Sequence, residues 1–400
     1  MALTGLLSLV GAQPWMRQHL RNMERPSVRG ALAVDTEHQP LYVGALWHLQ
    51  RRPVIVLTPR LEDARRLYDQ LLTYLGEDAP VWLLPEPEVL PFERLAVDAR
   101  TGNQRLSALA ALAAAGEPDT DPPLVIASVA SALRLTLSPD LTLGRHPRIE
   151  AAHRLQTGAR IPSVDALLEA WVELGYRREP QVEAPGAFSL RGGILDVFPP
   201  NAELPYRVEL WDDEVDTIRQ FDPESQRSVA DTGAVSIIAA REQLPELCDG
   251  SSFDERRGRI DLSSCNAATV MRFQEELGEL ITAPNSETLS FYNGLLNFHT
   301  LADYLPPSSI VVLDRPNRLA GEAEEQNDKY NQQRATRQER GELPYGFPSP
   351  STDWESLRRR MESAGIATVD MERWGVEDQP RLVETLADSS AGLSYFTDDV

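Results

Sequence analysis

Residues 188–227 read FSLRGGILDVFPPNAELPYRVELWDDEVDTIRQFDPESQR, and no other stretch of this chain says as much about its fold. The strand-like runs FSLR and ILDVF flank Gly192-Gly193, and glycine supplies the backbone freedom that a sharp reversal needs. The runs YRVELW and VDTIRQF flank a second reversal, Asp212-Asp213-Glu214. This alternation of short strands and tight turns predicts an antiparallel sheet.

The third run of this sheet separates two kinds of side chain. Val208 and Leu210 point to one face, whereas Arg207, Glu209 and Trp211 point to the other, because side chains alternate along a strand. The sheet is therefore expected to be half exposed, with arginines and large aromatic side chains toward solvent. Such side chains anchor protein interfaces. An ordinary meander with solvated arginines would show the same pattern, so both interpretations stay open.

Residues 1–137 show the alternation of an α/β domain. Apolar runs at 54–57 and 81–85 predict buried strands, and 61–76 and 103–116 predict helices that end at a glycine. Strands and helices that alternate in this way favour a parallel sheet covered by helices.

A small α+β domain is predicted for residues 138–225. Residues 161–178 form its helix, which Ser163 opens as N-cap. Residues 226–320 return to apolar α/β character, so the small domain is expected to be inserted between two halves of the first domain. Residues 321–352 predict a polar, solvated helix and a linker, and 353–400 predict the start of a third α/β domain that is incomplete at the end of this chain.

Composition excludes several classes of protein. The chain has 400 residues, a net charge of −22 and 42% hydrophobic residues, so it is expected to form real cores and to repel nucleic acid. It contains no run of 18 apolar residues, so no membrane partner is expected. Two cysteines form neither a disulfide framework nor a metal set.

Motifs that carry catalysis are missing from the sequence. Lys329 is the single lysine, and it lies far from any glycine-rich loop, so the phosphate-binding motif G-x-x-x-x-G-K-[ST] is absent. The six histidines show no paired metal spacing. We therefore expect no catalytic residue, no cofactor and no metal in this region.

The motif RGGILDVFPPNAELPYRVELWDDEVDTIRQFDPESQR closely resembles the sheet shared by the excinuclease protein UvrB and the transcription-repair coupling factors. Residues 83–109, with the loop LLPEPEVLPFERL, resemble the first domain of the coupling factors. The resemblance implies a degenerate, helicase-like parallel-sheet domain whose phosphate loop, near residues 31–44, is lost. It also implies that Asp314 is a relic of a Walker B acid or a strand-end cap.

The resemblance also implies a partner and a site. In both families the small domain binds the excinuclease protein UvrA, through an arginine after the helix-ending GY, the arginine of the RG turn and the phenylalanine before proline. The matching residues here are Arg177, Arg191 and Phe198. Phe198 shares a strand face with Ile194 and Asp196, so a role as a core residue stays open as an alternative.

The function that follows is a non-catalytic recruitment module of a transcription-repair coupling factor. It would bind UvrA and so bring nucleotide excision repair to a stalled RNA polymerase, in the bacterial cytoplasm. The ATP-driven motor and the contacts to RNA polymerase and DNA would lie in downstream domains of the full-length family protein. Two alternatives remain: an ATP-dependent repair enzyme like UvrB, and a stand-alone UvrA-binding scaffold.

Overall fold

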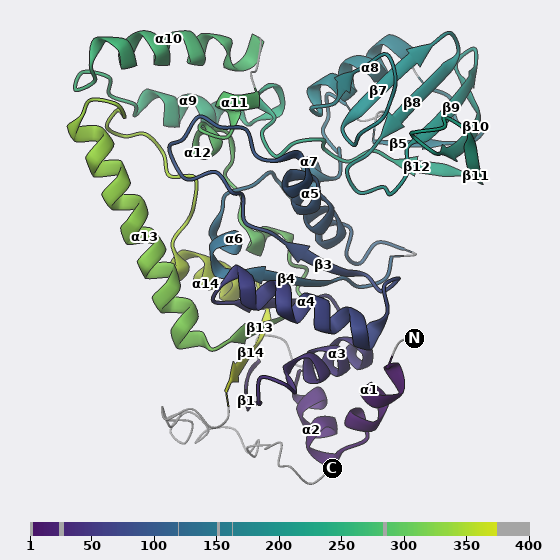
Figure 1. The fold of residues 1–400 in the computed structure, drawn as a ribbon, viewed down its shortest axis with the longest axis vertical. Coiled ribbons are helices and arrows are strands. Elements are labelled where there is room, and N and C mark those ends of the chain that lie inside the picture. The colour runs from purple at the N-terminus through teal and green to yellow at the C-terminus, as the bar shows by residue number, and fades with distance from the viewer. Residues whose placement is uncertain are drawn as a thin grey trace.

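The computed structural model describes residues 3–23, 28–118, 120–149, 153–161, 163–282 and 286–373. Figure 1 shows an α/β domain that carries a small β-rich domain at one upper corner and a group of helices at the other. The predicted α/β fold with an inserted antiparallel domain is confirmed.

The first domain is built on a six-stranded parallel sheet in the order β1-β14-β13-β2-β4-β3. The neighbouring strands β13, β2 and β4 are buried along their whole length, and their Val- and Ile-rich sequences are typical of a sheet that is covered on both faces. The strand bounds are Arg29–Ala33 (β1), Val54–Thr58 (β2), Val81–Leu84 (β3), Leu124–Ser128 (β4), Ile310–Asp314 (β13) and Ala367–Glu372 (β14).

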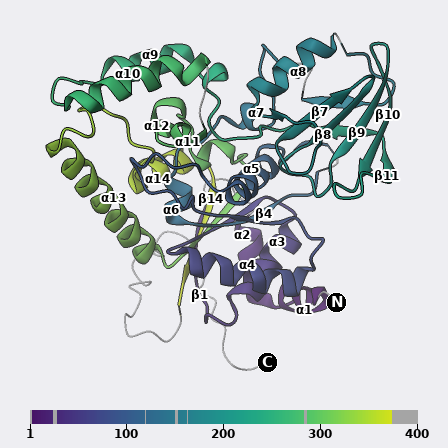
Figure 2. The ribbon, with the colours of Figure 1, turned by 45° about the horizontal axis from the view of Figure 1, so that its top comes forward.

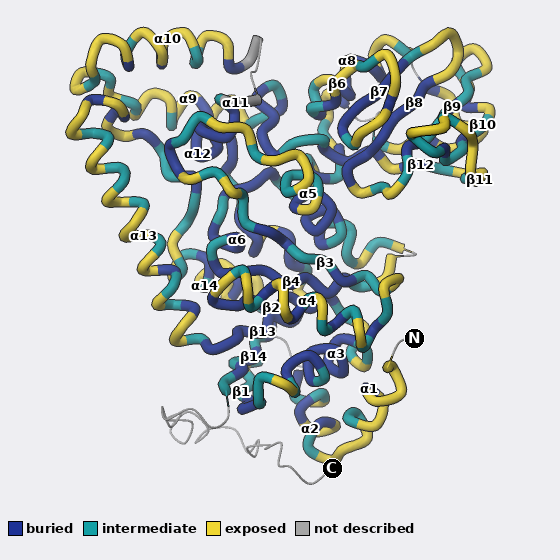
Figure 3. The backbone as a smooth tube through the Cα atoms, viewed as in Figure 1, coloured by how far each residue is buried: buried dark blue, intermediate teal, exposed yellow. Residues whose placement is uncertain are grey.

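Helices cover both faces of this sheet, and alternate residues of β2 show the division. Val54 and Val56 pack with the first group of helices, whereas Ile55 and Leu57 pack with the second. The first group is α1 (Thr4–Gly11), α2 (Pro14–Met23), α3 (Gln39–Gln50) and α4 (Leu61–Leu75). The second is α5 (Ala99–Ala113), α6 (Val129–Leu133), η2 (Leu301–Tyr304), α13 (Pro316–Glu339) and α14 (Trp354–Ser363). Figure 3 shows β2, β4 and β13 in dark blue.

The predicted start of a third domain at residue 353 is wrong for the described residues. Strand β14 lies between β1 and β13 and pairs with both in parallel, so α14 and β14 complete the first domain. The local sequence shows a helix followed by a strand, but it does not show which strands will accept it. Residues 374–400 of that prediction lie outside the described residues.

Residues 226–320 are more than the second half of the first domain. Within them, β13 joins the parallel sheet, while a separate group of helices packs around the aromatic side chains of Phe273, Phe291 and Tyr292. Figure 2 shows these helices apart from the small domain. Their bounds are α9 (Gly250–Gly258), α10 (Ala267–Thr282), α11 (Ser286–Leu289) and α12 (Asn293–Leu296). The short helix η1 (Pro245–Leu247) precedes them, and its Leu247 packs in the core of the small domain.

The small domain contains a six-stranded sheet in the order β11-β10-β9-β8-β7-β6 and a two-stranded sheet, β12-β5. It reaches past the predicted boundary at residue 225, because β11 pairs with β10 and β12 pairs back with β5. The bounds are α7 (Pro139–Thr142), β5 (Arg154–Gln156), α8 (Val164–Glu173), β6 (Arg177–Arg178), β7 (Ala187–Arg191), β8 (Ile194–Phe198), β9 (Tyr206–Trp211), β10 (Glu214–Phe221), β11 (Ser228–Thr232) and β12 (Ala234–Ser236).

Candidate functional site

One face of the six-stranded sheet, the inner face, is closed by helix α8. Ser163 caps this helix, since its hydroxyl accepts a hydrogen bond from the Ala166 amide. Trp171 is fully buried and meets the ring of Phe188 edge to face, with 5.6 Å between the ring centroids. Because the inner face is packed, the alternate residues of each strand are left on the opposite, outer face.

The strand register places all three predicted site residues on the outer face. Arg177 pairs with Ala187, and Ala187 pairs with Phe198, so these residues form one row across β6, β7 and β8. Arg191 pairs with Ile194 in a second row. The side chains of Arg177 and Arg191 are exposed, as the sequence predicts.

Phe198 differs from the two arginines, because it is only 6% exposed. It packs with Val182, Ala187 and Phe221 in a small apolar cluster on the outer face. The loop before β7 supplies Val182, and this cover was not visible in the strand pattern. Phe198 therefore stabilises the sheet, and a partner contact through it stays a prediction.

Asp196 is the residue of the outer face that sequence reasoning missed. It accepts hydrogen bonds from two arginines, Arg191 and Arg207, at nitrogen–oxygen distances of 2.6 Å and 2.7 Å. In the sequence, the position of Asp196 between Arg191 and Arg207 on neighbouring predicted strands was the pattern that could have identified it. A buried carboxylate needs such partners, because losing water without them costs free energy.

Apolar side chains extend the outer face beyond the arginines. Trp211, at the end of β9, is 80% exposed, and Ile194 on β8 is 38% exposed. Trp211 lies opposite Glu214 across a turn in which Asp212 has a φ of 57°. The predicted combination of arginines and large aromatic side chains toward solvent is therefore represented by Trp211, and Ile194 adds an aliphatic side chain to it.

Comparison with known proteins accounts for this geometry. Residues 154–242 match the family model described as the UvrB interaction domain, which covers α8 and the whole six-stranded sheet. The transcription-repair-coupling factor of Bacillus subtilis is 30% identical over 306 residues. The chain is thus similar to the N-terminal region of the transcription-repair-coupling factors, and it contains a UvrB interaction domain.

The match covers much of this chain and a small part of each relative. For the Bacillus subtilis protein it spans 72% of this chain and 24% of the relative. The transcription-repair-coupling factor of Myxococcus xanthus is 33% identical over 66% of this chain and 22% of the relative. That of Escherichia coli is 32% identical over 48% of this chain and 15% of the relative. The chain thus spans less than a quarter of the length of these curated relatives.

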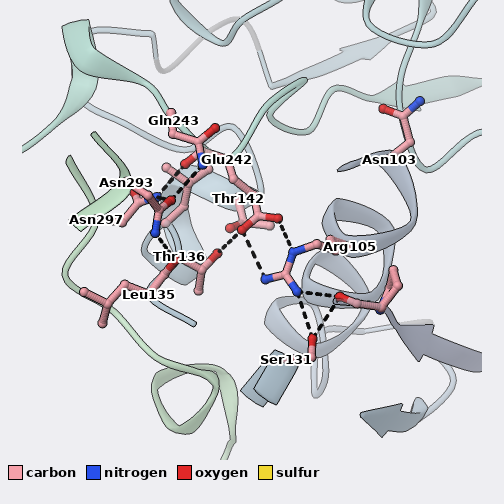
Figure 4. A network of polar contacts seen from close by, with 12 residues as sticks. Asn103, Arg105, Ser131, Leu135, Thr136, Thr142, Glu242, Gln243, Asn293 and Asn297 are labelled. Atoms are coloured by element: carbon pink, nitrogen blue, oxygen red, sulfur yellow. Dashed lines mark hydrogen bonds and ion pairs between the residues drawn. The ribbon is translucent and has the colours of Figure 1, made fainter. Parts of the chain in front are cut away.

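A buried polar network joins the small domain to the first domain (Figure 4). Arg105 on α5 donates to both carboxylate oxygens of Glu242, which follows the last strand of the small domain. Arg105 also donates to the Pro85 carbonyl at 2.7 Å and to the Ser131 hydroxyl at 2.8 Å. Both members of the ion pair are buried. The network therefore holds the exit of the small domain against the core of the first.

Amides continue the network beyond the ion pair. The Asn297 side chain donates to the Glu242 carbonyl at 2.8 Å, and the Gln243 side chain donates to the Asn293 side-chain oxygen at 2.7 Å. Asn293 in turn donates to the Leu135 carbonyl at 2.9 Å. These contacts join α12 and the segment after α6 to the same junction.

Acid is expected to weaken the junction. Burial alone would raise the pKa of Glu242, but Arg105, with help from Arg134, holds this pKa below its ordinary value. A carboxylate whose pKa is lowered by folding stabilises the fold above its unfolded pKa of about 4.3, and this contribution is lost as the pH falls through the folded pKa. Denaturant unfolding of the parent and of Glu242→Gln should show a stability difference that shrinks from pH 7 to pH 3. A difference that stays constant would contradict this prediction.

Side chains of this chain surround the Asp314 carboxylate close to residues 31–44, the segment for which the sequence predicts a lost phosphate loop. Gln39, at the start of α3, donates to Asp314 at 3.2 Å. Arg315 donates to Asp314 at 2.8 Å and to Asp63 at 2.5 Å. The buried Asp314 carboxylate is thus fully engaged at the end of β13, where a nucleotide-binding domain would present it to a metal–nucleotide complex.

Metal-site and membrane-span features are both lacking in the described ranges of the chain. Within them, no cluster of three or more His, Cys, Asp or Glu side chains has the arrangement of a metal site. None of the helices described there has the length and apolar character needed to cross a lipid bilayer.

Proposed function

We propose that the outer face of the small sheet binds UvrA, and that the chain thereby recruits nucleotide excision repair to a stalled RNA polymerase. The observation that carries the proposal is the match of residues 154–242 to the UvrB interaction domain. The exposure of Arg177 and Arg191 on one sheet face supports it, because arginine makes weakly hydrated, bidentate contacts to carboxylates. Contacts to RNA polymerase and DNA are assigned, within the same proposal, to other domains of the family protein.

The arginines are the first test of this proposal. Arg177→Ala and Arg191→Ala should each weaken UvrA binding about thirtyfold, equivalent to ~2 kcal/mol, because each truncation leaves a carboxylate of the partner unpaired. Isothermal titration calorimetry with purified UvrA measures the change. Thermal unfolding should stay nearly unchanged, since both side chains are exposed.

Arg65→Ala is the matched control, because Arg65 is an exposed arginine on α4 of the first domain. Its binding to UvrA should equal that of the parent chain. If Arg177→Ala and Arg191→Ala also bind UvrA as tightly as the parent chain, the proposal that the outer face recruits UvrA is wrong.

We further propose that this region is not an ATPase, which separates it from an ATP-dependent enzyme like UvrB. The chain lacks the phosphate-loop lysine, and Gln39 and Arg315 engage the Asp314 carboxylate. A fluorescent ATP analogue should therefore show no saturable binding, and phosphate release should equal that of buffer. Saturable binding with turnover that is lost in Asp314→Asn would instead favour the enzyme.

A further inference from the structure

Asp196 lies between Arg191 and Arg207 on the outer face, and these two arginines differ in their contacts. Its side chain is 1% exposed, whereas that of Arg191 is 50% exposed and that of Arg207 is 17% exposed. Arg207 donates to Asp196 through two nitrogens, at 2.7 Å and 2.8 Å, and lies 4.4 Å above the ring of Phe221. The Arg207 guanidinium therefore makes its contacts within the sheet.

Arg191 is held at one point only. One terminal nitrogen donates to Asp196 at 2.6 Å, and no other hydrogen bond of this guanidinium is found among the described residues. A guanidinium has five N–H donors in a rigid fork, so several of them remain available on the solvent side. The group that such a fork fits best is a carboxylate.

We infer that Asp196 is a positioning residue for partner binding: it holds the Arg191 fork in place to receive a carboxylate of UvrA. This inference rests on the proposed function of the outer face. Asp196 itself is too deeply buried to touch the partner, so it acts through Arg191. The anchor is rigid because Arg207 fixes the same carboxylate from the other side.

The Asp196–Arg191 ion pair favours binding because it already restricts the Arg191 side chain in the free protein. Less side-chain conformational entropy is then lost when the complex forms. Immobilising one long side chain at an interface weakens binding by about fivefold. Asp196 does not compete with the partner for the same donors, since it uses a single nitrogen of Arg191. Removing the anchor should therefore weaken the complex.

A double-mutant cycle tests this inference. Asp196→Asn should weaken UvrA binding about fivefold in the parent chain and less than about twofold in the Arg191→Ala background. In the Arg177→Ala background the same substitution should again cost about fivefold, because Asp196 makes no ion pair with Arg177. A merely structural role of Asp196 would give the same loss in all three backgrounds.

The outcomes separate this inference from the proposal on which it rests. If the parent chain does not bind UvrA, both fall. If the parent binds and Arg191→Ala weakens binding, but Asp196→Asn has no effect, tightens binding or adds independently of Arg191, the inference alone falls. If Asp196→Asn does not fold, Asp196→Glu replaces it in the cycle, since the longer side chain keeps the charge but displaces the anchor.

Discussion

Replacing Arg105 with alanine is expected to lower the free energy of unfolding by about 3–5 kcal/mol, because it leaves the buried Glu242 carboxylate without its charged partner. The substitution also leaves the Pro85 carbonyl and the Ser131 hydroxyl without a donor that each has in the parent chain. Urea denaturation followed by tryptophan fluorescence measures the loss.

The buried charge, rather than lost packing, is the expected cause. The double variant Arg105→Met/Glu242→Leu should therefore recover most of the stability, because a buried ion pair can be exchanged for apolar side chains of similar volume at little cost. Arg65→Ala, on an exposed position, should change the stability by less than about 0.5 kcal/mol. If Arg105→Ala lowers the free energy of unfolding by less than about 1 kcal/mol, water or a neighbouring group donates hydrogen bonds to the Glu242 carboxylate in place of Arg105.

Replacing Phe198 with alanine is expected to cost about 3–5 kcal/mol, the usual range for a buried phenylalanine. The ring packs with Val182, Ala187 and Phe221, and its removal leaves a cavity between the loop before β7 and the sheet. The melting temperature should fall by several degrees, as measured by circular dichroism.

Ile194→Ala is the matched control for Phe198→Ala, since Ile194 lies on the same strand and the same face but is partly exposed. It should lower the melting temperature far less. UvrA binding by the Phe198 variant, measured well below its melting temperature, then separates the two roles of this residue. An unchanged melting temperature together with weakened binding would make Phe198 an interface residue and not a core residue.

Much of the outer face could be predicted because strand alternation is local. The pattern of Val208 and Leu210 against Arg207, Glu209 and Trp211 correctly separated the packed face from the solvent face. Its limit appeared at Phe198, which lies on the predicted face but is covered by Val182. Alternation states which way a side chain points and not what covers it.

Contacts between distant segments could not be predicted in the same way. The place of β14 between β1 and β13 and the ion pair of Arg105 with Glu242 each join residues whose proximity no local pattern records. Sequence periodicity reports burial one element at a time, whereas the partner of a strand or of a buried charge depends on how the elements pack.

Three features could be predicted from residue type and from spacing along one segment: the two kinds of sheet, the missing phosphate-loop lysine and the exposure of Arg177 and Arg191. The burial of Phe198 and the ion pair of Arg105 with Glu242 became visible only once the segments were packed together. The reason is physical: burial and ion pairing arise where separate segments meet, and only packing brings those segments together.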